Sequence, residues 1–126
     1  MRVLLDTHAF LWWVEEDARL SRSARKTITD ASEGLVSIAS CWELAIKVSR
    51  GRIALSKPIG RLGEVLAASD LRLLPVDLED VARVATLPFH HRDPFDRVLA
   101  AQALNDELTI VSADPVFGQY GVKRVW

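Results

Sequence analysis

The chain has 126 residues, of which 49% are hydrophobic and 26% charged, and its formal net charge is -1. This length and composition are typical of a soluble globular protein, so we expect one domain over residues 1–126. The nearly balanced charge excludes a broad basic surface, and any binding of nucleic acid must be local. The single cysteine, Cys41, excludes an intrachain disulfide and a cysteine zinc site. Because no apolar run approaches the roughly 18 residues of a membrane span, we expect a cytoplasmic protein without a membrane partner.

Short apolar segments alternate along the chain with segments of helical periodicity. Thr7 is the expected cap of the first helix, and Gly34 is expected to separate the second helix from the second strand. The predicted strands cover residues 3–5, 35–38, 71–76 and 108–111, with an edge strand at 122–125. The predicted helices cover the segment after Thr7 and residues 21–31, 40–50, 60–69, 77–85 and 94–104. This alternation predicts an α/β fold, in which helices cover both faces of a parallel sheet.

The clearest helix start is the segment 93–104. Asp93 is a good N-cap, and Pro94 at the next position gives up a donor that the helix would leave unpaired. Asp96 falls on the first turn, where the helix dipole favours a negative charge. Small apolar residues follow, as expected of a helix that is buried against a sheet.

Four acidic residues stand where predicted strands give way to helices or loops. Asp6 and Asp114 follow strands, and Glu43 and Asp96 lie near the starts of helices. Because the carboxyl ends of parallel strands meet at one sheet edge, we expect the four carboxylates to face one crevice. Their mutual repulsion requires compensation, and Mg²⁺ or Mn²⁺ prefers such oxygen ligands. A metal held in this way is suited to phosphodiester hydrolysis.

Each acid also has a structural interpretation. The segment 40–43 fits a capping box, in which Glu43 would bond only to its own helix. Asp96 alone fits a residue that interacts with the helix dipole, and Asp114 before Pro115 is a common turn pair. Asp6 is the hardest to explain structurally, because an acid that ends a buried strand needs a partner.

Other polar and aromatic residues near these acids are less specific. His90 and His91 are adjacent in a loop, so we expect them to be solvent-exposed or to contact phosphate rather than to bind metal. Tryptophans at helical spacing are expected in the core or an interface, with base stacking as the alternative; these are Trp12, Trp13 and Trp42. The basic residues that could hold an RNA backbone, with ordinary surface charge as the alternative, are Arg92, Arg97, Arg22, Arg25 and Lys26.

These segments together resemble the PIN-domain ribonucleases, and within them the VapC-type toxins of toxin–antitoxin modules. The resemblance covers nearly the whole chain in order. It rests on the segments Leu4-Leu5-Asp6-Thr7-His8, Ser37-Ile38-Ala39-Ser40-Cys41-Trp42-Glu43, Arg92-Asp93-Pro94-Phe95-Asp96-Arg97, Ala100-Ala101-Gln102-Ala103 and Val111-Ser112-Ala113-Asp114.

The resemblance implies a single PIN-like domain with strand order 3-2-1-4-5. It also implies an endoribonuclease dependent on Mg²⁺ or Mn²⁺, a homodimer, and neutralisation by a small VapB-like antitoxin. The family's acidic quartet, which is both catalytic and metal-binding, carries over onto Asp6, Glu43, Asp96 and Asp114. Asp96 is preferred to Asp93 as the third acid because it precedes the segment 98–103 at the family's usual offset.

Two alternatives remain open at this point. A non-catalytic PIN-like module would keep the acid pocket but serve in binding or as a scaffold. A phosphatase with an aspartyl nucleophile is weaker, because Asp6-Thr7-His8 lacks the second aspartate that such enzymes use as general acid. We also expect part of the apolar surplus at residues 10–14, above all Leu11 or Trp12, to lie in a groove or interface.

Overall fold

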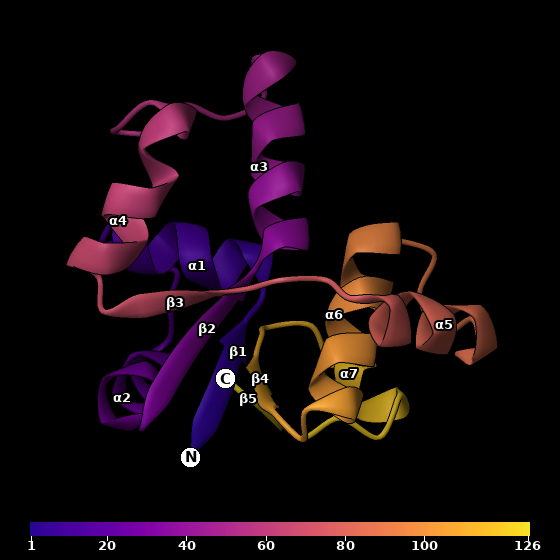
Figure 1. Cartoon of the computed structure of the whole chain (residues 1–126). Helices are drawn as coiled ribbons and strands as arrows, with labels where there is room; N and C mark the ends of the chain where they lie inside the picture. Colours follow the sequence, from indigo (N-terminus) through magenta and orange to yellow (C-terminus); the bar gives the residue numbers. More distant parts are fainter.

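A computed structural model describes all residues, 1–126, and contains one five-stranded parallel sheet (Figure 1). The strand order is β3-β2-β1-β4-β5, which confirms the predicted fold. The strands are β1 (Arg2–Leu5), β2 (Glu33–Ser37), β3 (Leu71–Leu74), β4 (Thr109–Val111) and β5 (Arg124–Val125). The helices are α1 (Thr7–Val14), α2 (Arg22–Asp30), α3 (Ile38–Ser49), α4 (Leu62–Ala68), α5 (Leu78–Thr86), α6 (Pro94–Asn105) and α7 (Val116–Gln119), and a 3-10 turn, η1 (Ile59–Arg61), precedes α4.

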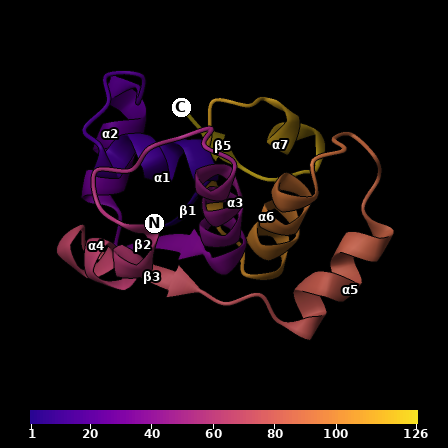
Figure 2. The same ribbon diagram turned by 90° about the horizontal axis from the view of Figure 1, so that it is seen from above.

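Helices cover both faces of this sheet, as Figure 2 shows from above. Side chains alternate between the two faces of a strand, so neighbours in β1 enter different cores. Leu4 packs with α6 and α7, whereas Val3 and Leu5 pack with α1, α2 and α4. The near-continuous apolar strands are explained by this burial on both faces.

The second strand and the third helix meet earlier than the sequence suggested. The predicted strand 35–38 is shifted: β2 begins at Glu33 and includes Gly34, and α3 begins at Ile38. Ser37 caps α3 by accepting a hydrogen bond from the N–H of Ala39 at 3.0 Å. A Cβ on Gly34 would lie 2.8 Å from Leu71 Cδ2, so a larger residue in this strand would require the Leu71 side chain to shift. The short helix α7 was not predicted, because its four residues have too few turns for a visible periodicity.

None of the helices is both long and apolar enough to cross a bilayer. The carboxyl ends of β1 and β4 lie side by side because these two strands pair directly. The residues that follow the two strands, Asp6 and the segment 112–114, are brought together by this pairing.

Candidate active site

Asp6 joins the end of β1 to the start of α1. Its Oδ1 accepts the N–H of Ala9 at 2.8 Å, so Asp6 is the N-cap, and the prediction that Thr7 has this role is wrong. The side chain is buried, with 7% of the residue exposed. Burial raises the pKa of the Asp6 carboxyl, while hydrogen bonds from Ser112 and from the Ala9 N–H oppose the rise. Asp6 is therefore an acid held rigidly at the sheet edge.

Glu43 reaches the same edge from the second turn of α3. Its Oε1 accepts the Thr7 hydroxyl at 2.6 Å, and its Oε2 lies 2.9 Å from Lys47 Nζ, one helical turn further on. The capping-box interpretation of Glu43 is wrong, because α3 begins at Ile38 and Ser40 is already inside the helix. Glu43 instead connects α3 to α1 through Thr7.

Two acids at the start of α6, Asp93 and Asp96, have different roles. Asp93 is the N-cap, and its Oδ1 accepts the N–H groups of Phe95 at 2.9 Å and Asp96 at 3.2 Å. Asp96 has no capping role and points away from the helix backbone. Burial raises the pKa of Asp96 to about 7, with further contributions from the negative charges of its neighbours, Asp93, Asp6, Glu43 and Asp114. The four predicted site acids thus lie close enough for their charges to be coupled.

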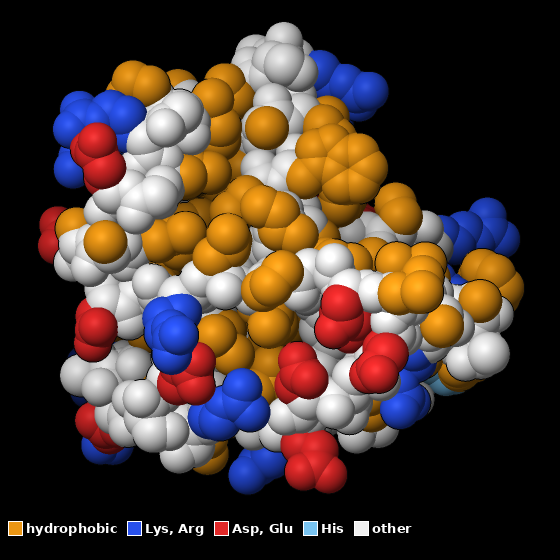
Figure 3. All heavy atoms as spheres, viewed as in Figure 1, with side chains coloured by type: hydrophobic (Ala, Val, Ile, Leu, Met, Phe, Trp, Pro, Cys, Tyr) orange, Lys and Arg blue, Asp and Glu red, His pale blue; other side chains and the backbone are white.

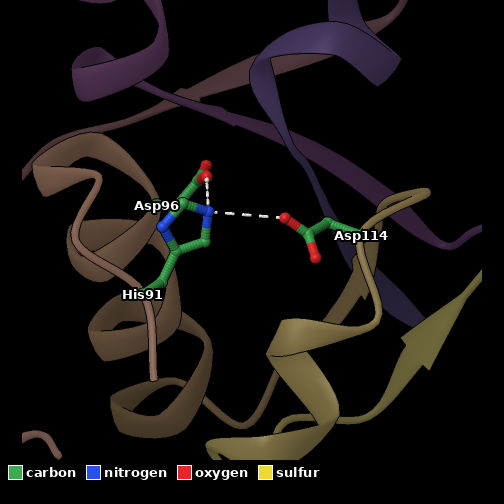
Figure 4. A group of neighbouring side chains, drawn as sticks. All are labelled: His91, Asp96 and Asp114. Carbon is green, nitrogen blue, oxygen red and sulfur yellow. Dashed lines mark ion pairs between the residues drawn. The ribbon is translucent and has the colours of Figure 1, made fainter. Parts of the chain in front are cut away.

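Asp114 lies in the turn after β4 and is the most accessible of the four. Its Oδ1 accepts the N–H of Val116 at 3.0 Å, and its own N–H donates to Ser112 Oγ at 3.0 Å. The turn interpretation of Asp114 is therefore correct, but it does not exclude a role in the site. Its Oδ2 remains directed toward α6 and the loop before it (Figure 4).

His91 is the residue that sequence reasoning placed wrongly. We expected exposure to solvent or phosphate, but its ring lies between two acids, with Nε2 at 3.1 Å from Asp96 Oδ2 and 3.4 Å from Asp114 Oδ2 (Figure 4). Its Nδ1 accepts the N–H of Asp93 at 3.0 Å. The available signal was the spacing of two residues between His91 and Asp93, whose N–H donates to the imidazole. His90, by contrast, is exposed.

Arg97 was predicted as an RNA contact, and the structure contradicts this. The residue is 6% exposed, and its guanidinium lies 4.3 Å from the centre of the Phe89 ring. It donates to three backbone carbonyls and one hydroxyl, those of Val84, Leu87, Pro88 and Tyr120. Arg97 therefore holds the end of α5 and the following loop in place, because it donates to carbonyls at the end of the helix and beyond it.

The remaining basic candidates are spread over the molecule. Lys26 pairs with Asp30 at 2.9 Å and lies beside Met1, at the sheet edge opposite the acids, so it does not belong to the site. Arg92 is exposed next to Asp93. Roles for Arg92, Arg22 and Arg25 in holding RNA remain predictions.

The donor atoms of the site fit a hard divalent cation. They are carboxylate oxygens on α1, α3, α6 and the turn after β4, and Mg²⁺ and Mn²⁺ prefer such ligands. One nitrogen and two carboxylate oxygens, from His91, Asp96 and Asp114, lie within 4.8 Å of one another. In the absence of a cation, burial raises the pKa of Asp96 most, and the negative charges of the neighbouring acids raise it further. Such a site can therefore gain stability by binding one.

Comparison with known proteins identifies the family. The family model for the PIN domain matches residues 3–123. Ribonuclease VapC22 of Mycobacterium tuberculosis is 34% identical over 113 residues, which is 89% of this chain and 86% of that protein. The chain is a PIN-domain protein of the VapC family. This result confirms the resemblance that the sequence motifs indicated.

Solved structures of VapC-family complexes share the fold of this VapC-family chain. VapBC2 of Rickettsia felis, bound to promoter DNA, gives a TM-score of 0.71 at 15% identity and covers 99% of this chain and 98% of the other. DNA-bound VapBC of Salmonella typhimurium gives 0.71 at 18% identity, with coverages of 99% and 97%. At this low identity the comparison supports the arrangement of strands and helices, and the roles of individual residues depend on the geometry described above.

Proposed function

We propose that the chain is a metal-dependent endoribonuclease that acts as the toxin of a toxin–antitoxin pair. The observation that supports this most directly is that Asp6, Glu43, Asp96 and Asp114 lie together at the carboxyl ends of β1 and β4. The similarity to a protein named as a ribonuclease supports RNA as the substrate. A binding module would have no use for carboxylates that repel one another.

The hydrogen bonds of the acids support a division of roles among them. We expect Asp6 and Asp96 to be the principal metal-holding residues, because both are carboxylates at the site and Asp96 Oδ1 accepts no hydrogen bond. Asp114 completes the site. Bound Mg²⁺ or Mn²⁺ would acidify a water and neutralise the charge of the phosphodiester. We expect Glu43, whose carboxylate contacts Thr7 and Lys47, to orient the attacking water or accept its proton.

The products distinguish this chemistry from attack by the RNA itself. Attack of water on the phosphodiester leaves 5′-phosphate and 3′-hydroxyl ends, whereas attack by the 2′-hydroxyl leaves a cyclic phosphate. We expect single-stranded or loop RNA as substrate, because a splayed strand enters a crevice more easily than an A-form duplex. Trp42 is 64% exposed beside Glu43, and its ring lies 5.3 Å edge-on from that of Phe95 beside Asp96. The exposed Trp42 ring is suited to stacking on a base next to the cleaved bond.

The function is tested by incubating structured RNA with the purified chain and Mg²⁺ and mapping the end chemistry of the fragments. We expect cleavage that EDTA abolishes, and that Asp6→Ala and Asp96→Ala abolish as well. Asp77→Asn is the matched control, because Asp77 is an N-cap acid of α5 outside the site. Cleavage in EDTA, or cyclic phosphate products, would contradict the mechanism. Full activity in both alanine variants would contradict the site assignment. It would indicate that a contaminating nuclease cleaves the RNA.

A groove between α1, α3 and α4 is the proposed docking place of the antitoxin. Its walls are mostly apolar and include Leu11, as expected from the apolar surplus at the end of α1. The residues on α4 that face it are Leu62 and Val65. An apolar segment of a small VapB-like protein fits such a surface. We expect Val65→Asp to weaken binding of the antitoxin encoded next to this chain, with Glu64→Gln on the same helix as the control.

A second apolar face supports a homodimer. Figure 3 shows hydrophobic side chains gathered over α3, β3 and α5. The exposed large ones that are not assigned to base stacking are Ile38, Leu73, Leu78 and Val81. Patches of this kind are uncommon on monomers. Light scattering is expected to give a dimer for the native chain and a monomer for Val81→Asp, whereas Glu79→Gln on the same helix should remain dimeric.

A further inference from the structure

Phe89 is the most exposed large hydrophobic residue of the chain, at 83%. It lies in the loop between α5 and α6. The guanidinium of Arg97 lies over one face of its ring, 4.3 Å from the ring centre. Because most of the side chain is exposed, the opposite face of the ring is open to solvent. A single exposed apolar residue is common on protein surfaces, so the surroundings of Phe89 decide whether it has a task.

The loop is fixed on both sides of Phe89. Before it, Arg97 donates to the carbonyl of Pro88 at 2.9 Å. After it, the N–H of His91 donates to the Tyr120 hydroxyl at 2.9 Å. The fold therefore holds an aromatic ring outward instead of leaving it on a free loop. A side chain that is already ordered loses little conformational entropy when a ligand packs against it.

Phe89 and Trp42 lie on opposite sides of Asp96. Successive residues of an α-helix are rotated by about 100°, so Phe95 and Arg97 point to opposite sides of α6, with Asp96 between them. Phe95 contacts the Trp42 ring of α3 at 5.3 Å between ring centres, whereas Arg97 contacts Phe89. Figures 1 and 2 both show α6 between α3 and α5. The acid is thus flanked by two exposed aromatic rings.

The open face of Phe89 is also close to the acids along the chain. Two residues of extended backbone span at most about 7 Å, and Phe89 is two residues before His91. The imidazole of His91 lies 3.1 Å from Asp96. A phosphodiester bound at the acids carries a nucleoside on each side, and each base has a face that can stack on an aromatic ring. An unpaired base is therefore the ligand that suits this ring.

We propose that Phe89 is a second base-stacking residue of the site, and that an RNA strand crosses the acids from Trp42 to Phe89. The cleaved phosphodiester then lies between two stacked bases. This inference rests on the proposed ribonuclease function and deepens it. It requires an unpaired nucleotide on each side of the cleaved bond, because a paired base keeps its faces inside the duplex.

Binding of a short fluorescein-labelled oligouridylate tests the proposal by fluorescence anisotropy. Phosphorothioate linkages slow hydrolysis of this RNA, so Mg²⁺ can be present. Phe89→Leu keeps an apolar side chain but removes the aromatic face, and we expect its affinity to fall roughly 5- to 100-fold. Phe89→Tyr keeps the ring and is the matched control, with an affinity within about twofold of the native chain. Circular dichroism verifies the fold of each variant.

Photochemical crosslinking locates the stacked bases directly. The same RNA is made with 5-iodouridine, which on irradiation joins to aromatic side chains that stack on it. Trypsin is expected to release the peptides 84–92 and 27–47, whose only Phe, Tyr or Trp residues are Phe89 and Trp42. We expect crosslinks on both peptides of the native chain. In Phe89→Leu we expect a crosslink on 27–47 alone.

Each result decides between defined alternatives. If the native chain binds and cleaves RNA but Phe89→Leu binds it equally well, or peptide 84–92 carries no crosslink, this inference is overturned and the ribonuclease function stands. A lower oligomeric state of Phe89→Leu in light scattering, with native RNA affinity, would place Phe89 in a protein interface and overturn the inference. A native chain that binds no RNA in Mg²⁺ would overturn both this inference and the proposed function.

Discussion

The starts of α1 and α6 both bring an acid to the site, but they do so differently. At α1 one residue, Asp6, caps the helix and faces the site. At α6 the tasks are separated, because Asp93 caps the helix and Asp96 faces the site one turn later. A residue with two tasks is held rigidly by its cap bond. A residue with one task accepts no backbone hydrogen bond, so no such bond stabilises its negative charge.

The difference is visible in the balance of forces on each carboxyl. Hydrogen bonds from Ser112 and Ala9 oppose the effect of burial on the pKa of Asp6. Every cause that shifts the pKa of Asp96 raises it. The α6 acid therefore has no hydrogen bond that offsets the effect of burial, and a cation would offset it.

The largest expected effect is on RNA cleavage, and it should be the same at both helices. Asp6→Asn keeps the cap, since asparagine is as good an N-cap as aspartate, and Asp96→Asn leaves Asp93 in place. Each should reduce cleavage about 100-fold or more, because a bound metal contributes several kcal/mol to the barrier. Rates of cleavage of one end-labelled RNA measure this. A native rate in either variant would show that this acid is not part of the site. The two helix starts would then not contribute equally to cleavage.

The next effect concerns the arginine that α6 has and α1 lacks. Arg97→Met should lower the free energy of unfolding by about 2–4 kcal/mol, because several buried carbonyls lose their donor. Arg92→Met, in the exposed neighbouring position, should change it by less than about 0.5 kcal/mol. Urea denaturation of the two variants gives both numbers. An unchanged stability in Arg97→Met together with weaker RNA binding would restore Arg97 as a phosphate contact.

The third effect is the pH dependence of stability in metal-free buffer. The pKa of Asp96 is about 7 in the folded chain and ordinarily 3.8, so between these values the folded state binds more protons than the unfolded one. The free energy of unfolding contributed by Asp96 therefore falls as pH rises through this window and is constant above it. At pH 8, Asp96→Asn should be more stable than the native chain by roughly 1–3 kcal/mol.

The same comparison at pH 4 should show no difference, because Asp96 is then protonated in the folded chain. Thermal unfolding in EDTA at the two pH values is the measurement, and His91 is common to both proteins. An equal stabilisation at both pH values would mean that the effect is not electrostatic. A loss of stability at pH 8 would show that Asp96 has a structural task after all, like Asp6.

The smallest effect separates the two tasks at α6. Asp93→Ala removes the cap and should cost about 1 kcal/mol of stability, whereas Asp93→Asn should cost a few tenths. Thermal unfolding of both variants is the measurement. Because Asp93 faces Asp96, the asparagine variant also removes a negative neighbour, and this relief should partly offset its loss. If alanine and asparagine were equally destabilising, the hydrogen bonds from Phe95 and Asp96 would not be the main contribution of Asp93.

Local signals were reliable where a single segment decides the structure. The start of α6 at Pro94, with Asp93 as cap, is as predicted, because capping and the fixed φ of proline act within a few residues. The Ser40–Glu43 motif failed because Ser37 offers an equally good cap three residues earlier. β2 ends there, so the tertiary position of the strand decides between two local solutions of similar energy.

The sequence by itself determined the order of strands and helices, the acids that end strands or begin helices, and, through its motifs, the family. These depend on periodicity, capping and turn chemistry, which act over a few residues. Only the tertiary structure decided that Arg97 is buried and that His91 lies between Asp96 and Asp114. Both outcomes require contacts between the end of α5, the start of α6 and Tyr120, which no local pattern encodes. A charged side chain in a loop looks the same in sequence whether solvent or another segment satisfies it, and the packing of distant segments makes that choice.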